Sequence, residues 1–326
     1  MQLARRPPPD TRPAVRAAQT PEAQTGCMDL QDAPGGGNAA AVEAMQQGAL
    51  DPEIAKLIEA GDEGRLEVIA DREPGRFSGA SWQQRWAVLD MLQCGTTDAI
   101  EERGIRNLLR DASVTDRGAI LRRVDQNGDH HDLDELVFHD IDDEAIRAEV
   151  LELVQQTGSL KKERGVISDF DDTVSPHRDK RSGSEFAGAA ELYAELEGEE
   201  PGDVHYVTAR PGMFAGGVKG KLAKLGMPKG TVEPGSLSRI LGEGEAGMEA
   251  EKIEDIERIL LLHPGQRFVL IGDDSQRDPA AYEAIMKKFP DRVERVVIRR
   301  TGHAHEPERK GLDYVDDFVE AKALFD

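Results

Sequence analysis

The C-terminal half of the chain alternates short apolar runs with helical patterns, and this alternation restricts the fold more than any other feature. Strands that alternate with helices form parallel sheets whose two faces are both covered. We therefore expect an α/β fold, with a Rossmann-like parallel sheet and helices on both faces. The four strand-like runs, all rich in valine or isoleucine, are RGVISDFDD (164–172), DVHYVTARP (203–211), QRFVLIGDD (266–274) and RVERVVIRR (292–300).

The sequence before this region has a different character. Residues 1–45 are rich in proline and glycine and carry few core-forming residues, which predicts a disordered tail. Residues 46–160 show apolar residues at three- and four-residue spacing without strand-like alternation. We predict a small all-helical domain there, whose role and protein partner stay open, followed by an α/β domain at 161–326. The expected core residues are Trp82, Trp86, Leu89 and Leu92, and the expected N-caps are Asp51, Ser81, Thr115 and Asp142.

Composition excludes several classes of function. The chain carries 63 Asp and Glu against 41 Lys and Arg, for a net charge of −22, which disfavours stable nucleic-acid binding. Its two cysteines, Cys27 and Cys94, do not predict a disulfide framework. No apolar run reaches the roughly 18 residues of a membrane span, and no apolar segment follows the N-terminal arginines as in a signal peptide. We expect a cytoplasmic protein, with peripheral membrane attachment as the second location.

Polar side chains stand at the ends of three predicted strands. Asp169 and Asp171 follow the first run, Thr208 ends the second, and Asp273 ends the third. Ligands of open α/β sheets bind beyond the carboxyl ends of the strands, so we expect these side chains to converge. Carboxylates that meet there repel one another unless a cation lies between them, and oxygen ligands of this kind suit Mg²⁺.

Other acidic pairs are interpreted differently. Asp132 with Asp134, and Asp140 with Asp142, repeat the D-x-D pattern inside the helical region. An acidic chain produces such pairs by chance, so we interpret both as solvated surface.

The ordered set of motifs resembles the haloacid dehalogenase-like (HAD) phosphohydrolases over about residues 162–300. The set is D-x-D-x-T at 169–173, a strand-end threonine at 208, a lysine at a helix start at 252, and G-D-D-x-x-x-D at 272–278. This resemblance implies that Asp169 is the nucleophile and forms an aspartyl-phosphate. It also implies that Asp171 is the general acid and base.

The same resemblance implies how the phosphoryl group and the metal are held. Thr208 and Lys252 would hold the transferring phosphoryl group, together with Ala209 and Arg210 beside Thr208. The implied cofactor is Mg²⁺, bound by Asp169, the Asp171 carbonyl and Asp273. Either Asp278 or Asp274 would support it.

A narrower resemblance is to the catalytic domain of App1-type (DUF2183-like) phosphatidate phosphatases. It is carried by GVISDFDDTVSPH, HYVTARPGMF and the long segment EKIEDIERILLLHPG through VVIRR. It implies a hydrolase of lipid metabolism that converts phosphatidate to diacylglycerol. Two positions depart from that family: Asp274 stands where serine is usual, and Arg210 where a small polar residue is usual. Both departures bear on which substrate is bound more than on the reaction mechanism.

The lengths between motifs leave no room for a large cap domain, so we expect an open site. An open site suits a phosphate on a large body, such as a lipid at a membrane surface. Two alternatives stay open: the same chemistry on a protein or nucleic-acid end, and a phosphatidate-binding module without turnover. Basic groups that could guide an anionic substrate follow three of the motifs: His177, Arg178, Lys180 and Arg181; Lys219 to Lys229; and Arg299, Arg300, His303, His305, Arg309 and Lys310.

Overall fold

A computed structural model describes most of the chain from residue 50 onward. The predicted tail (1–45), both cysteines, His305 and the basic group at 177–181 lie outside the described residues. Within the described residues, no helix combines the length and the apolar character that a bilayer crossing requires. The described ranges are 50–93, 97–125, 132–158, 164–175, 186–197, 203–211, 215–235, 244–275, 277–304 and 306–325.

The first part of the described chain is helical, as the sequence predicts. The caps Asp51 and Ser81 are confirmed, and Ser81 forms a capping box with Gln84. Two other caps were placed wrongly. The helix at 114–125 begins at Val114, before Thr115, and the helix at 144–157 is capped by Asp143 rather than Asp142. The elements are α2 (Pro52–Ala60), α3 (Glu63–Arg72), η2 (Pro74–Phe77), α4 (Trp82–Leu92), α5 (Ala99–Arg110), α6 (Val114–Asp125), η3 (Glu135–Asp140) and α7 (Glu144–Thr157).

A single core holds this helical region together. Leu89 and Leu92 are fully buried in it, as expected, whereas Trp82 and Trp86 pack against its edge and are only partly buried. Both tryptophans lie on α4, and Arg123 stacks over the Trp86 ring at 4.6 Å. The boundaries of the predicted domains stay a prediction.

The second part of the chain is an α/β unit with a parallel sheet, which confirms the expected fold class. The strand order is β3-β2-β1-β4-β5-β6, and all described pairings are parallel. The strands are β1 (Arg164–Asp169), β2 (Val204–Pro211), β3 (Thr231–Gly235), β4 (Arg267–Asp273), β5 (Val293–Arg299) and β6 (Asp313–Val315). The helices are α8 (Ala189–Glu197), α9 (Ala215–Lys224), α11 (Gly244–Leu262), α12 (Asp278–Lys288) and α13 (Phe318–Lys322).

Strands β3 and β6 were missed by the sequence prediction. The first, TVEPG, contains a proline and a glutamate, and the second has only three residues. Neither segment carries a run of valine and isoleucine, because strands at the edges of a sheet contribute less to its core than the central ones.

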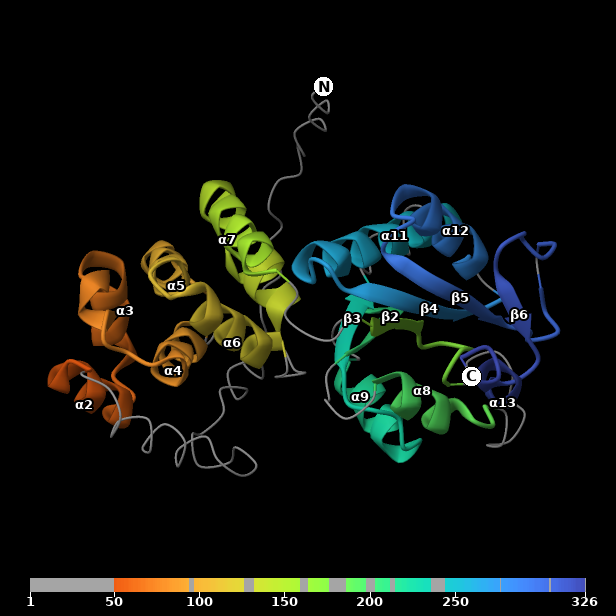
Figure 1. Ribbon diagram of the computed structural model, residues 1–326, viewed down its shortest axis with the longest axis horizontal. Coiled ribbons are helices and arrows are strands. Elements are labelled where there is room, and N and C mark those ends of the chain that lie inside the picture. Colours follow the sequence, from red (N-terminus) through yellow and green to blue (C-terminus); the bar gives the residue numbers. More distant parts are fainter. Residues whose placement is uncertain are drawn as a thin grey trace, which may run out of the picture.

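Each face of the sheet has its own core, and alternation along the strands divides the side chains between them. Val166 and Val269 point into a core with α8, α9 and α13. Ile167 and Leu270 point into a core with α11 and α12. Figure 1 shows these two helical layers on opposite sides of the sheet. Burial on both faces leaves the carboxyl ends of the strands as the place where polar side chains can gather.

The helical region packs against α11 of the α/β unit. Leu262 at the end of α11 is buried in the helical core, and Gln155 of α7 donates a hydrogen bond to the Leu261 carbonyl. Arg258 lies 3.8 Å from Asp134 and stacks over Phe138 at 5.6 Å. A second contact pairs His263 with Asp125 at 3.5 Å.

The interpretation of Asp132 and Asp134 as solvated surface was therefore wrong, since both are buried against the α/β unit. Burial raises the pKa of the Glu233 carboxyl beside them well above its ordinary value, and their negative charges add to the rise. Burial also raises the pKa of Asp255 to about 6, against the opposing effect of Arg258. Arg258 is thus the cation that offsets the repulsion among the buried carboxylates of this interface.

We predict that Arg258→Met lowers the free energy of unfolding by roughly 1–3 kcal/mol, because it leaves buried carboxylates without their cation. The deficit should grow as the pH rises above about 6, where Asp255 ionises in the native protein. Urea unfolding at two pH values measures this. The exposed Arg267 offers a matched control as Arg267→Met, and an equal loss in both variants would contradict the role given to Arg258.

Candidate active site

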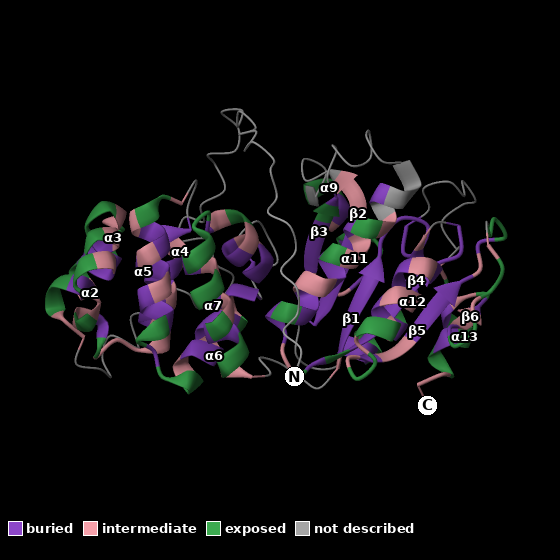
Figure 2. Cartoon of the chain, turned by 90° about the horizontal axis from the view of Figure 1, so that it is seen from above, coloured by how far each residue is buried: buried purple, intermediate pink, exposed green. Residues whose placement is uncertain are grey.

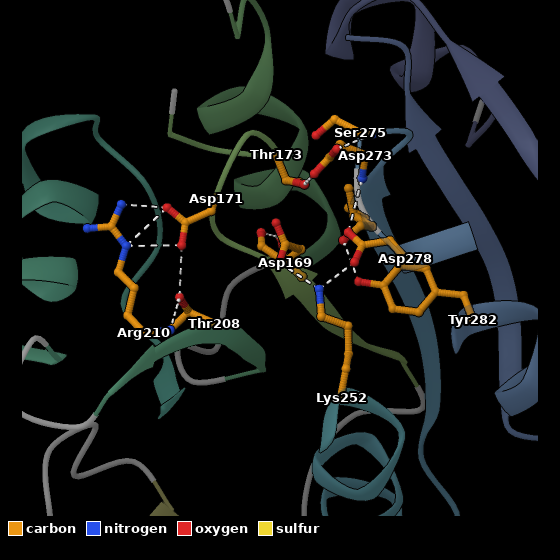
Figure 3. A network of polar contacts seen from close by, with 12 residues as sticks. Asp169, Asp171, Thr173, Thr208, Arg210, Lys252, Asp273, Ser275, Asp278 and Tyr282 are labelled. Carbon is orange, nitrogen blue, oxygen red and sulfur yellow. Dashed lines mark hydrogen bonds and ion pairs between the residues drawn. The ribbon is translucent and has the colours of Figure 1, made fainter. Parts of the chain in front are cut away.

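Three neighbouring strands bring the predicted residues to one edge of the sheet. Asp169 ends β1 and Asp273 ends β4, while Thr208 lies in β2 on the other side of β1. All three are buried, with exposed fractions of 3%, 0% and 2%. Figure 3 shows them facing a common space. The expectation that the strand ends converge is confirmed.

Lys252 reaches this space from α11. Its ammonium donates to Asp169 Oδ1 at 2.7 Å and to Asp278 Oδ1. The side chain is only 11% exposed. Burial by itself lowers the pKa of Lys252, but the charges of Asp169 and Asp278 outweigh it and raise the pKa well above its ordinary value. The lysine is therefore a fixed positive charge at the site.

Asp169, Asp273 and Asp278 form a carboxylate cluster that suits a hard cation. One oxygen from each lies within 4.8 Å of the others. Asp169 Oδ2 is buried and has no hydrogen-bond partner among the described residues. Asp278 Oδ2 accepts from the Asp273 backbone amide at 3.2 Å, and Asp273 Oδ1 accepts from the Ser275 amide at 2.6 Å. An orphaned buried oxygen among carboxylates at this spacing is the donor set that fits Mg²⁺.

The cluster carries more negative charge than Lys252 alone can balance. Burial raises the pKa of Asp273 to about 7, and the neighbouring Asp278 adds to the rise. Burial also raises the pKa of Asp169 well above its ordinary value, against the opposing charge of Lys252. Burial therefore favours protonation within the cluster, most clearly at Asp273.

The loop after β1 turns sharply and separates Asp171 from Asp169. Asp172 has a φ of 60°, a left-handed conformation that aspartate adopts more readily than most residues. The amides of Val174 and Ser175 both donate to the Phe170 carbonyl at 3.1 Å, and Arg299 donates to the Asp172 carbonyl. Side-chain alternation along the strand does not orient Asp171, because β1 ends at Asp169.

Asp171 instead faces the end of β2, where it meets two of the predicted phosphate-binding residues. Arg210 Nε donates to both of its carboxylate oxygens at 3.0 Å, and Thr208 Oγ1 donates to Oδ2 at 3.1 Å. The Arg210 amide also donates to Thr208 Oγ1 at 3.2 Å. Figure 3 shows this group beside the one built on Lys252. The guanidinium and the hydroxyl thus contact a carboxylate where a phosphate could bind.

The remaining predicted residues take different positions. The register between β2 and β3 shifts between Thr208 and Pro211, so Ala209 lies in an irregular stretch at the strand end. Asp274 Oδ1 accepts from the amide and hydroxyl of Thr301 at 2.8 and 2.6 Å. It is not among the carboxylates that cluster with Asp169. As metal ligands, Asp171 and Asp274 stay predictions.

Sequence reasoning assigned no role to Gly272. A Cβ at this position would lie 2.4 Å from Asp278 Oδ2 and 2.8 Å from the Tyr282 ring, so only glycine lets Asp278 approach the strand. The signal was present in the sequence as the glycine of G-D-D at 272–274.

The family model for the catalytic domain of phosphatidate phosphatase APP1 matches residues 164–300. This segment belongs to that family. It spans the sheet from β1 to β5 and contains all of the predicted site residues, whereas the helical region lies outside it. Neither a curated protein nor a solved structure matches the chain. The family match supports phosphatidate phosphatase activity, which is the activity of a phosphoric monoester hydrolase.

We predict that Asp273→Asn stabilises the metal-free protein near neutral pH by roughly 2–4 kcal/mol. A carboxyl whose folded pKa of about 7 exceeds the unfolded value binds its proton more tightly in the native state, so stability falls as pH rises through about 4 to 7. The asparagine removes this dependence. Thermal unfolding in EDTA from about pH 5 to pH 8 measures it. A variant with the same pH slope as the native protein would contradict the assignment.

Proposed function

We propose that the chain is a Mg²⁺-dependent phosphatase of HAD type that hydrolyses phosphatidate to diacylglycerol through an aspartyl-phosphate. One observation carries the proposal: a buried carboxylate, Asp169, has one oxygen bound to Lys252 and the other without a partner among the described residues. A lysine on one oxygen favours the ionised form, and the second oxygen is left available for attack.

In the proposed reaction Asp169 attacks the phosphorus of the monoester. A bond forms between its carboxylate oxygen and phosphorus while the bond to the glycerol oxygen breaks. Asp171 donates a proton to the departing oxygen, which leaves as the hydroxyl of diacylglycerol. A water molecule then attacks phosphorus and gives its proton to Asp171. The bond to Asp169 breaks, inorganic phosphate leaves, and both carboxyl groups return to their starting states.

Asp169, Asp273 and Asp278 are the carboxylates that would hold Mg²⁺, since they form the described cluster. The Asp171 carbonyl is the fourth candidate. Of the two supporting residues that the sequence left open, Asp278 is favoured over Asp274, whose carboxylate is bound to Thr301. The ion would supply positive charge that keeps the cluster ionised and neutralises phosphoryl oxygens.

Thr208, Arg210 and Lys252 would hold the phosphoryl oxygens. In the ligand-free structure each of them already contacts a carboxylate of the site: Thr208 and Arg210 contact Asp171, and Lys252 contacts Asp169. A phosphate can replace a carboxylate at a guanidinium, because both offer paired oxygens at similar spacing. Substrate binding would therefore draw Arg210 away from Asp171 and leave that carboxyl able to act on the departing oxygen.

We expect Asp169→Asn to abolish phosphate release from phosphatidate in mixed micelles, because the amide cannot attack phosphorus. The measurement is phosphate release with and without Mg²⁺, with p-nitrophenyl phosphate as a generic substrate. Asp116→Asn, at a half-buried residue of the helical region, is the control. Phosphate release from p-nitrophenyl phosphate but not from phosphatidate would support the proposed mechanism and contradict phosphatidate as the substrate. Phosphatidate binding without release from either substrate would support a binding module.

We expect Arg210→Gln to raise the KM for phosphatidate by about 10- to 100-fold, the range set by losing a charge-assisted hydrogen bond to phosphate. Arg210→Lys keeps the charge but not the paired donors, so its KM should lie between those of Arg210→Gln and the native enzyme. Steady-state kinetics with separate kcat and KM values measure this. A higher kcat/KM in Arg210→Gln would instead show that Arg210 restrains Asp171 and does not bind substrate.

A further inference from the structure

Helix α9 lies close to the proposed active site. It begins at Ala215, shortly after the end of β2, where Thr208 and Arg210 lie. Lys221 Nζ lies 6.0 Å from the centre of the Phe170 ring, and Phe170 separates Asp169 from Asp171 in the sequence. The Arg210 guanidinium contacts the same ring at 5.3 Å. Figure 2 shows α9 at the edge of the molecule where the end of β2 lies.

The segment that contains α9 is basic in a strongly acidic chain. Residues 211–232 contain four lysines and neither aspartate nor glutamate, although the whole chain has 63 acidic residues. We call the four lysines, together with Leu225, the α9 lysine surface. They are Lys219, Lys221, Lys224 and Lys229.

Three of these lysines have no carboxylate beside them among the described residues. Within the ranges that the structure describes, no ion pair forms at Lys221, Lys224 or Lys229. Several basic residues elsewhere are neutralised by neighbours, at distances of 2.6 to 2.8 Å in these pairs: Arg300 with Glu308, Lys287 with Glu283, Lys322 with Glu195, and Arg277 with Glu306.

The same comparison separates the basic groups that the sequence had placed around the site. Arg299 is buried and donates to the Asp172 carbonyl, and Arg309 pairs with Glu283 and Glu306. Arg299, Arg300 and Arg309 of the group after the last strand are thus engaged by other groups of the protein. Lys221, Lys224 and Lys229 lie within nine residues of one another and form no ion pair among the described residues, so together they can act on an external anion.

An exposed apolar residue follows directly after the end of α9. Val218 and Leu222 are buried against the sheet, whereas Lys224 and Leu225 face solvent, Leu225 with 38% of its surface exposed. The glycines at 216, 217 and 220 add no side chain that could cover the neighbouring lysines, and the space around each is open. A leucine among lysines is the composition of a segment that lies at a lipid–water interface.

We propose that the α9 lysine surface docks the enzyme onto an anionic lipid bilayer and so presents the active site to the headgroups. The proposal rests on the proposed lipid substrate. A substrate anchored in a bilayer can be reached only if the mouth of the site faces the membrane. A chain with a net charge of −22 is repelled by an anionic leaflet, so a local excess of positive charge must overcome that repulsion.

Vesicles of phosphatidylcholine and phosphatidylglycerol test the docking apart from catalysis, because phosphatidylglycerol is anionic but carries no phosphate monoester. Each lysine near an anionic surface contributes about fivefold to partitioning. Lys224→Glu/Lys229→Glu should therefore weaken binding more than tenfold in a vesicle flotation assay. Lys56→Glu/Lys287→Glu makes the same change in net charge on α2 and α12 and is the control.

Hydrolysis adds a second measurement that distinguishes the docking surface from the active site. The α9 variant should release phosphate from p-nitrophenyl phosphate at the native rate and from phosphatidate in vesicles much more slowly. Equal vesicle binding by the two charge-reversal variants, or a native protein that does not bind the vesicles, would overturn the proposal. Vesicle binding that depends on α9 in a protein without phosphatidate turnover would leave the docking surface standing and refute the substrate.

Discussion

The position of Lys252 is the constraint on which the site depends. Its ammonium lies between Asp169 and Asp278, at an edge of the sheet that collects carboxylates from several elements. Two buried carboxylates without this cation would repel each other and take up protons. The lysine keeps Asp169 bound through one oxygen, while the other oxygen is buried without a hydrogen-bond partner among the described residues. The same side chain therefore contributes to the fold, balances the charge of the site and contacts the proposed nucleophile.

Helix α11 links this lysine to the helical region. Lys252 lies near the middle of the helix, not at its start as the sequence predicted, and Asp255, Arg258 and Leu262 follow on turns that contact η3 and the helical core. The helical region therefore braces the element that carries Lys252, although it lies outside the segment that matches the phosphatase family. Buried contacts of this kind hold a functional side chain more accurately than a loop can.

The groups proposed to hold phosphate are balanced by carboxylates of the site itself. Arg210 and Thr208 contact Asp171, and Lys252 contacts Asp169, so each group proposed to hold phosphate already has an anionic partner. On the proposed function, we expect such a site to exchange one anion for another, without desolvating a bare cation when substrate arrives.

The sequence by itself determined the sheet, the helices on both faces and the residues at the strand ends, because strands and helices have different apolar periods and parallel strands end at one edge. It did not reveal β3 or β6, whose few apolar residues give no period. Only the tertiary structure decided that Asp278 joins the carboxylate cluster while Asp274 binds Thr301, and that Asp171 turns toward Arg210. It also showed Asp132 and Asp134 to be buried against another element. Contacts of this kind join segments that can be more than a hundred residues apart, and no local pattern along the chain encodes such pairings.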